Sequence, residues 1–542
     1  MRRASSFRTT VTTLLLVLLL AACGEDEPSR AGGDGGGASS GPGANDGPDG
    51  GGPAPKPVTE EPPLDVEWWG RKPTARLFLS GGQQGAFRPT SHDHPPTGGL
   101  ERTAAVLYRV RDIGKKQGTA VGAVGLGWSM RGNLEQQEEA RADYLRALHA
   151  ALGYDAALLG GTDLTVDAMC QPRGPGPETP TPPLNVKPSN TNPTAGATRV
   201  YADVQVGPVA VRALGIVDPV EAQVLADAGL VDAVSSPAQN MAGLRPKPDA
   251  VWVVGTRLIG KGTLGEIVGS LRRLGPGIVV DMSGKGFGEA KLDRAPLRAD
   301  GDPLVVALPP HGTDVGVLDF DKGDDGAWLV SYRQIPLVAA WEKYGGPALA
   351  SAKHLSSLYR QLLRERRYVH TFQRMRRTDA TYVGSSACAA CHAAIYNDWR
   401  GSTHATALEG LTRVGHEWDP ECLRCHVVGW ERGKDGTWTS WKSGFRDAEK
   451  TPFMGGVGCE NCHGPGSAHA ADPYDRSLFA PGGPNRRSMD KQGCMTCHDA
   501  ENHHGFAEAF ETQHLPAVDH RRVPSDRRTV LPEGWKKGGS GR

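Results

Sequence analysis

Eight of the ten cysteines form one recurring pattern, Cys-x-x-Cys-His, in the last third of the chain. Two thiols at this spacing can add to the two vinyl groups of a haem, and the imidazole that follows can then ligate the iron. Zinc ribbons and disulfides also use paired cysteines, but neither needs a histidine directly after every pair. The pattern therefore predicts four covalently attached haem c groups, held by Cys388, Cys391, His392, Cys422, Cys425, His426, Cys459, Cys462, His463, Cys494, Cys497 and His498.

Histidine is concentrated in the same part of the chain, with twelve of the 17 histidines between His370 and His520. Low-spin iron with two axial imidazoles, which suits electron transfer, is therefore available to most or all of the haems. We expect about half of the further histidines to be ordinary solvated side chains. The candidate distal ligands are His370, His404, His416, His469, His503, His504, His514 and His520.

The elements that carry these residues must be short, because the first and last motifs are separated by only about 110 residues. Such a segment cannot form four pockets and an apolar core of its own. We therefore expect haem to supply most of the core of a mostly helical or irregular domain over residues 379–510. Haems packed this closely are what an electron relay requires.

The motif-bearing segment resembles the tetrahaem cytochrome c-554 family. The shared residues are the first motif with Trp399 and Ser402-Thr403-His404-Ala405, the run from Cys422 to Trp430, and the run from Gly456 to Gly466. The resemblance implies that His404 and His469 are distal ligands, and that His404 serves a different haem from that of His392. It also implies a five-coordinate haem on His426, which His416, His503 or His504 could close. The remaining distal ligand is sought among His503, His504, His514 and His520, and His503 is included in the predicted set.

Upstream of the motifs, apolar β-rich runs alternate with amphipathic helical stretches, which indicates an α/β domain over residues 66–345. The predicted strands are Ala75–Ser80, Ala120–Leu126, Ala156–Leu159, Val209–Val217, Ala250–Val254, Gly277–Asp281 and Leu304–Leu308. The predicted helices are Leu100–Ile113, Leu134–Leu152, Val220–Ala228 and Thr263–Leu274.

This domain resembles the calcineurin-like metallophosphoesterases, in particular the 5′-nucleotidases, through segments beginning at Leu77, Gly98, Leu152 and Asp314. The resemblance implies a two-sheet α/β sandwich. The family's metal ligands, however, fall on Gly82 and Gln84, near Trp128, and on Gly161 and Thr162, none of which is a strong ligand. Two-metal hydrolysis needs carboxylates and imidazoles that converge on paired ions. We therefore expect a phosphoesterase-like fold whose hydrolytic site is lost.

Two further features of this domain are chemically suggestive. His92-Asp93-His94 could bind a metal ion, but a solvated Pro-rich loop is the favoured interpretation. Cys170 stands apart from the motifs and is expected to be inert.

A connecting helix is predicted over residues 346–378, with apolar spacing and basic residues between Leu349 and Met375. Its basic face is expected to be solvated, with contact to haem propionates or an acidic redox partner as the alternative. The basic tail over residues 511–542 is expected to be disordered.

The N-terminus predicts export and a lipid anchor. Arginines precede the apolar run Leu14–Leu20, which is too short to span a membrane, and Leu20-Ala21-Ala22-Cys23 follows. We expect a lipoprotein signal peptide over residues 1–22, acylation of Cys23, and a disordered Gly- and Pro-rich tether over residues 23–65. The expected location is the cell envelope, at the outer membrane facing the periplasm or the cell surface.

A formal net charge of zero gives no indication of nucleic-acid binding. The favoured function is electron transfer between redox partner proteins in the cell envelope, with the membrane reached through the lipid anchor alone. A haem enzyme that acts on a small nitrogen or oxygen species at His426 is the alternative, and an active nucleotidase is the weakest hypothesis. The predicted architecture is multidomain: a two-sheet, metallophosphoesterase-like α/β sandwich followed by a mostly α-helical or irregular tetrahaem cytochrome c domain.

Overall fold

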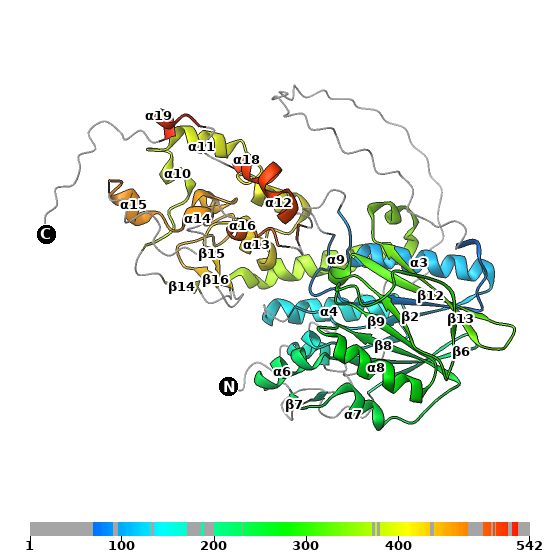
Figure 1. Cartoon of the computed structure of the whole chain (residues 1–542). Helices are drawn as coiled ribbons and strands as arrows, with labels where there is room; N and C mark the ends of the chain where they lie inside the picture. Colours follow the sequence, from blue (N-terminus) through cyan, green and yellow to red (C-terminus); the bar gives the residue numbers. More distant parts are fainter. Residues whose placement is uncertain are drawn as a thin grey trace, which may run out of the picture.

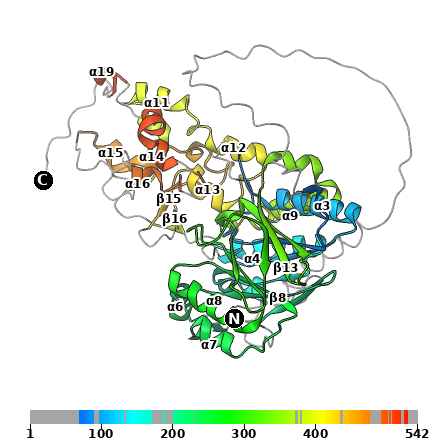
Figure 2. The same ribbon diagram turned by 45° about the vertical axis from the view of Figure 1, so that its right-hand side comes forward.

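The computed structural model describes residues 69–89, 96–131, 135–170, 186–188, 200–229, 231–370, 374–376, 380–433, 438–474, 491–499, 502–503, 506–518 and 523–528. We call the described residues up to 345 the α/β body and those from 380 onward the C-terminal region. Figures 1 and 2 show the two parts side by side, with helix α9 (Gly346–Arg366) running between them.

The α/β body contains two large mixed sheets. The first has the order β10-β13-β12-β1-β2-β3, and its members are β1 (Ala75–Ser80), β2 (Ala120–Gly125), β3 (Ala156–Ala157), β10 (Lys291–Leu297), β12 (Asp314–Lys322) and β13 (Trp328–Pro336). The second has the order β11-β9-β8-β6-β5, and its members are β5 (Ala202–Val206), β6 (Val209–Ile216), β8 (Ala250–Thr256), β9 (Gly277–Asp281) and β11 (Leu304–Ala307). A separate two-stranded sheet pairs β4 (Val186–Pro188) with β7 (Val231–Val234).

Each sheet contains parallel strand pairs whose members include strands buried on both faces. Strand β1 pairs in parallel with β2, and β8 pairs in parallel with β6 and β9. Every residue of β1, β8 and β9 is buried, which explains why these strands are continuous apolar runs rather than alternating patterns.

Helices cover the sheets. The first sheet packs with α3 (Leu100–Gln117), α4 (Glu135–Ala151) and α9, and the second with α7 (Pro237–Ala242) and α8 (Lys261–Leu274). Helix α8 buries Ile267, Leu271 and Leu274, whose spacing places them on one face. Helix α6 (Pro219–Asp227) is capped by Asp218, which accepts a hydrogen bond from the Val220 backbone nitrogen.

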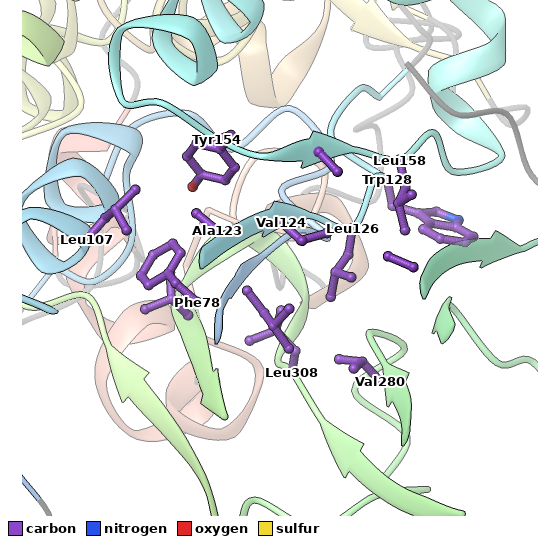
Figure 3. Close-up of a cluster of buried hydrophobic side chains, with 14 of the residues drawn as sticks. Phe78, Leu107, Ala123, Val124, Leu126, Trp128, Tyr154, Leu158, Val280 and Leu308 are labelled. Carbon is purple, nitrogen blue, oxygen red and sulfur yellow. The ribbon is translucent and has the colours of Figure 1, made fainter. Parts of the chain in front are cut away.

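The core of the body lies between the sheets. Figure 3 shows Phe78, Val124 and Leu126 from the first sheet and its loops near Val280 and Leu308 of the second. All five side chains are fully buried. The predicted two-sheet α/β sandwich is therefore confirmed.

The sequence pattern found helices α3, α4, α6 and α8 and seven strands of the body, but not the short helices α5 (Asp167–Cys170) and α7. Strands β5, β10, β12 and β13 were not predicted as such. Strand β10 is largely exposed and breaks its register with β13 between Leu292 and Ala295, so it lacks a clean apolar alternation.

The connecting helix is shorter than predicted. It ends at Arg366, because Arg367 takes a left-handed conformation with φ of 47° and its backbone nitrogen bonds back to the Arg364 oxygen. Arg374–Met375 forms strand β14 instead of helix, so the predicted continuation to Met375 is wrong.

The C-terminal region consists of short helices and one small sheet, β14-β16-β15, whose further strands are β15 (Trp430–Arg432) and β16 (Trp438–Trp441). Its helices are α10 (Ser385–Cys388), α11 (Ala393–Arg400), α12 (Ala407–Val414), α13 (Pro420–His426), α14 (Cys459–His463), α15 (Ser467–Ala471), α16 (Lys491–Cys494), α17 (Phe506–Ala509), a π-helical turn (Phe510–His514), α18 (Leu515–Val518) and α19 (Ser525–Arg528). Among the described residues, no helix has the length and apolar character needed to cross a membrane.

Candidate haem-binding sites

Each Cys-x-x-Cys-His motif lies in or beside a short helix. The second and third motifs are within α13 and α14, while the first and fourth begin at the ends of α10 and α16. The His392 backbone nitrogen donates to the Cys388 oxygen at 2.9 Å, and His498 donates to Cys494 at 3.0 Å. This helical turn places residues three and four apart on one face, so both thiols and the imidazole of a motif can approach the same ligand.

Two predicted distal histidines face motif histidines. The rings of His392 and His469 are nearly parallel, at 24°, with centroids 6.5 Å apart. Those of His404 and His498 have centroids 6.2 Å apart. If each ring nitrogen ligates an ion at about 2 Å, two opposed imidazoles have centroids about 6 Å apart. The donor type and spacing therefore fit an iron with two axial histidines at both places.

The second of these pairs joins residues that are far apart in the sequence. His404 follows the first motif closely in sequence, yet it faces His498 of the fourth motif. The Val457 backbone nitrogen donates to the His404 oxygen at 2.8 Å, which fixes this segment against the third motif. The structure thus brings elements of three motifs together around His404.

The other candidate histidines have different surroundings. His503 lies against His498, with 2.9 Å between their Nδ1 atoms, and its ring centroid is 5.1 Å from that of His514. The Nε2 atom of His370 is 3.0 Å from an Asp447 carboxylate oxygen. His416 is buried beside Asp419 and Cys422. His504 and His520 lie outside the described residues, so their predicted roles stay open.

His426 is oriented by the backbone. Its Nδ1 atom lies 2.9 Å from the Ala407 carbonyl oxygen, a contact that favours a proton on Nδ1 and leaves Nε2 available to a metal. Burial lowers the pKa of His426 despite this hydrogen bond. The neutral imidazole, which is the metal-binding form, is therefore favoured.

Thiols from different motifs lie side by side. Cys388 of the first motif contacts Cys459 of the third, and Cys425 of the second contacts Cys497 of the fourth. Together with the histidine pairs, these contacts gather all four motifs into one cluster.

The residues between the cysteines of the third motif hold this cluster together. The buried Glu460 carboxylate accepts hydrogen bonds from the backbone nitrogens of Val383, Gly384 and Gly466. The Asn461 side chain donates to the Val427 oxygen at 2.9 Å. No role was predicted for either residue from the sequence; their presence in the Gly456–Gly466 run was the only signal.

A small, partly open cavity of about 10 Å³, room for about one water molecule, lies between the second, third and fourth motifs and is lined by Tyr382, Arg424, Trp430, Trp438, Glu460 and Cys497, among others. Arg424 is 4% exposed, and its Nε and Nη1 atoms have no hydrogen-bond partner among the described residues.

The α/β body also presents a position where ligands commonly bind, at the carboxyl ends of its parallel strands. There the Gly82 backbone nitrogen donates to the Gly127 oxygen at 2.8 Å, and the Gln84 nitrogen donates to the Trp128 oxygen at 2.9 Å. The positions assigned to lost metal ligands after β1 and β2 are therefore adjacent in space.

Trp128 fills this place. It is fully buried with φ of 55°, and its indole nitrogen donates to Glu221 at 3.0 Å. A Cβ atom on Gly160 would lie 2.2 Å from the indole, so this residue must be glycine. Among the described residues, three metal-ligating side chains come together at His416, Asp419 and Cys422, which are not in the body. The pairing of Trp128 with Glu221 was not predicted, because it links distant segments of the chain.

Of the remaining predicted features of the body and the N-terminus, the structure describes Cys170 alone. Cys170 is 2% exposed. His92, Asp93 and His94 lie outside the described residues, as do Cys23 and the predicted signal peptide and tether.

Comparison with known proteins distinguishes the two parts. A sequence model of the family "Cytochrome c554 and c-prime" matches residues 387–464. Cytochrome c-554 of Nitrosomonas europaea is 29% identical over an alignment of 171 residues that covers 26% of this chain and 68% of that protein. These matches support a multihaem c-type cytochrome with covalently bound haem. The family match contains the first three motifs, whereas the fourth, at Cys494, lies beyond it.

The solved structures similar to this chain include a 5′-nucleotidase precursor from Thermus thermophilus, with 18% identity and a TM-score of 0.39 over 63% of this chain and 68% of that one. They also include a calcineurin-like phosphoesterase from Bacillus subtilis, with 14% identity and a TM-score of 0.36 over 53% of this chain and 98% of that one. At these identities the likeness concerns the fold alone, and the sandwich itself is established by the two sheets described above.

Proposed function

We propose that this protein is a lipid-anchored cytochrome that carries four haem c groups and transfers electrons between redox partner proteins in the cell envelope. The observation that supports it best is the pairing of motif histidines with histidines outside the motifs, His392 with His469 and His498 with His404. Such pairs favour six-coordinate iron, and the crossing contacts draw the haems close together. Closely spaced six-coordinate haems are suited to electron transfer.

Each part of the motif has a separate role in this proposal. The eight motif cysteines would anchor the haems, and His392, His426, His463 and His498 would supply one iron ligand each. His469 and His404 would supply the second ligand for the haems of His392 and His498. When bound, the haem supplies the one-electron redox centre; the chain supplies its ligands, orientation and exclusion of water.

The haem count and ligation are tested on the full-length protein. The alkaline pyridine haemochrome spectrum should give four haems per chain. His404→Ala should convert one low-spin haem to a high-spin or ligand-binding form, whereas His354→Ala on the exposed face of α9 should change nothing. A spectrum unaffected by His404→Ala would contradict its assignment as a ligand.

A haem enzyme is the second candidate, because one of the histidines considered able to close the His426 haem is held elsewhere. His503 lies against His498 of the fourth motif, whereas His416 lies beside Cys422 of the second motif. An accessible iron at His426 would let a small nitrogen or oxygen species bind. A high-spin component in the oxidised EPR spectrum, and nitric oxide or carbon monoxide binding after reduction, would favour it; a purely low-spin protein that binds neither gas would exclude it.

Acylation of Cys23 would place the protein at the outer membrane, facing the periplasm or the cell surface. Labelled palmitate should be incorporated by the full chain and not by Cys23→Ser. Fractionation should move the variant from the membrane to the soluble envelope fraction, and membrane retention of the variant would contradict anchoring at this residue.

Phosphoesterase activity is the weakest candidate, because Trp128 occupies the strand-end position. Nucleotide incubated with the protein and divalent metal should release no phosphate above background. Release that Glu221→Gln leaves unchanged would place activity elsewhere in the chain.

A further inference from the structure

A buried polar contact joins the α/β body to the helix that bears the second haem motif. Helix α13 begins with Asp419 as its N-cap and Glu421 in its first turn. Four side chains of the body converge on these two carboxylates: Gln137 and Arg141 from α4, and Arg88 and Arg131 from loops near the strand ends.

Asp419 is held from two sides. It accepts a hydrogen bond from the Glu421 backbone nitrogen at 3.1 Å, which caps α13, and another from the Gln137 amide at 2.5 Å. The part-exposed Arg88 lies 3.6 Å away. Burial by itself would raise the pKa of Asp419, but Arg88 and His416 lower it overall, so the carboxylate stays ionised.

Glu421 is surrounded by cations. Arg131 approaches it at 2.9 Å, Arg141 pairs with it, and Arg424 lies 3.4 Å away on the next turn of α13. Glu138 completes the network by pairing with Arg141 at 2.7 Å and accepting from the Arg131 backbone nitrogen. Burial, followed by repulsion from Arg424 and Arg141, lowers the pKa of Arg131 to about 9.

Such a network is costly to bury and is therefore a strong indication of a fixed geometry. Gln137, Arg141 and Asp419 are each at most 2% exposed. Taking several charges out of water costs free energy that is offset only if their mutual geometry is accurate, and removing one partner leaves the others uncompensated. The contact therefore fixes the start of α13 relative to α4.

The same helix ends at the iron ligand. Cys422, Cys425 and His426 follow Glu421 within the seven residues of α13, a rigid element about 10 Å long. A displacement at Glu421 is consequently carried to all three haem-binding side chains, because no flexible segment separates them.

We propose that the α/β body forms part of the second haem site, with Arg141, Arg131 and Gln137 as positioning residues that set the orientation of α13. The body is then a component of the redox apparatus, and not only a spacer between anchor and haems. This inference rests on haem attachment at Cys422 and Cys425.

The test uses the full-length haem-loaded protein and a potentiometric titration followed by absorption and EPR spectra. Arg141→Ala and Gln137→Leu should each shift the midpoint potential and EPR signature of one haem and leave the remaining haems as in the wild type. Arg141→Lys, which keeps the charge, should restore the wild-type signature in part. Arg76→Ala is the matched control, because Arg76 is an equally buried arginine whose partner, Asp319, lies within the body.

Two outcomes would overturn the inference. One is an unchanged signature for every haem in both variants while the body stays folded by circular dichroism. The other is an equal shift of all haems, or the same shift in Arg76→Ala, since either would show general destabilisation. Failure of the underlying haem assignment is separate: mass spectrometry of the wild-type peptide would then show Cys422 and Cys425 without haem.

Discussion

The α/β body and the C-terminal region differ in what fills their interiors. Strands β1, β8 and β9 of the body are buried along their whole length, and a continuous apolar cluster joins both sheets. In the C-terminal region, helices α11 and α15 contain no buried residue, and the apolar cluster is small. The body can fold around its own side chains, whereas the C-terminal region needs a large apolar cofactor to remove comparable surface from water.

The side chains that can bind a cofactor are concentrated in the part with the smaller apolar core. The body has the better-packed fold, yet its strand-end site is filled by Trp128, which pairs with Glu221. The C-terminal region has the sparser core and concentrates the cysteines and histidines. How tightly a part of the molecule is packed therefore says little about what chemistry its side chains can do.

The largest expected effect tests the dependence of the C-terminal region on haem. Cys459→Ala with Cys462→Ala should remove one haem and, because the third motif packs against the first, make this region sensitive to protease while the body resists. Limited proteolysis with mass spectrometry of the fragments measures this. Cys170→Ala is the control, and a C-terminal region that stays resistant would show a core independent of that haem.

The Arg76→Ala substitution tests whether the body can be destabilised without any change at the haem sites. Arg76 and Asp319 form an ion pair with side-chain exposures of 0% and 3%. Leaving one buried charge alone costs about 3–5 kcal/mol. Urea unfolding of the body should shift by this amount while the haem midpoint potentials stay constant; altered potentials would mean that the two parts are less separate than their cores suggest.

The pH dependence of the body's stability should come in part from His149. Burial lowers the pKa of His149 from 6.5 to about 4. The unfolded chain therefore binds more protons than the folded chain between these values, and stability falls by about 3 kcal/mol as the pH drops from 6.5 to 4. His149→Phe should flatten this part of the curve, measured by urea unfolding at several pH values. An equal slope in both proteins would assign the dependence to other groups.

The smallest expected effect concerns Glu460. Gln at this position cannot accept hydrogen bonds through its amide nitrogen, so at least one of the three backbone donors loses its partner, at a cost of about 2 kcal/mol. Thermal unfolding followed at the Soret band should shift to lower temperature for Glu460→Gln and not for the exposed Glu449→Gln. Equal melting curves for the two variants would remove Glu460 as a determinant of this region.

The sequence by itself determined the features that depend on residues close together in the chain. The Cys-x-x-Cys-His spacing indicates haem attachment because one helical turn brings the three side chains together. The fully buried strands and amphipathic helices of the body were found for the same reason, since their periodicity reports local conformation and burial. The left-handed Arg367 that ends α9 was not visible in this way, because apolar spacing continues beyond it.

Only the tertiary structure decided which distant segments meet. It placed His404 opposite His498, put Trp128 against Glu221, and set α4 on the carboxylates at the start of α13. Each contact joins residues on separate elements, so its free energy depends on the packing of the whole chain. Such contacts produce no periodic pattern of residues in the sequence. The motifs therefore indicate that haem binds, while the packing of the chain determines the surroundings of each site.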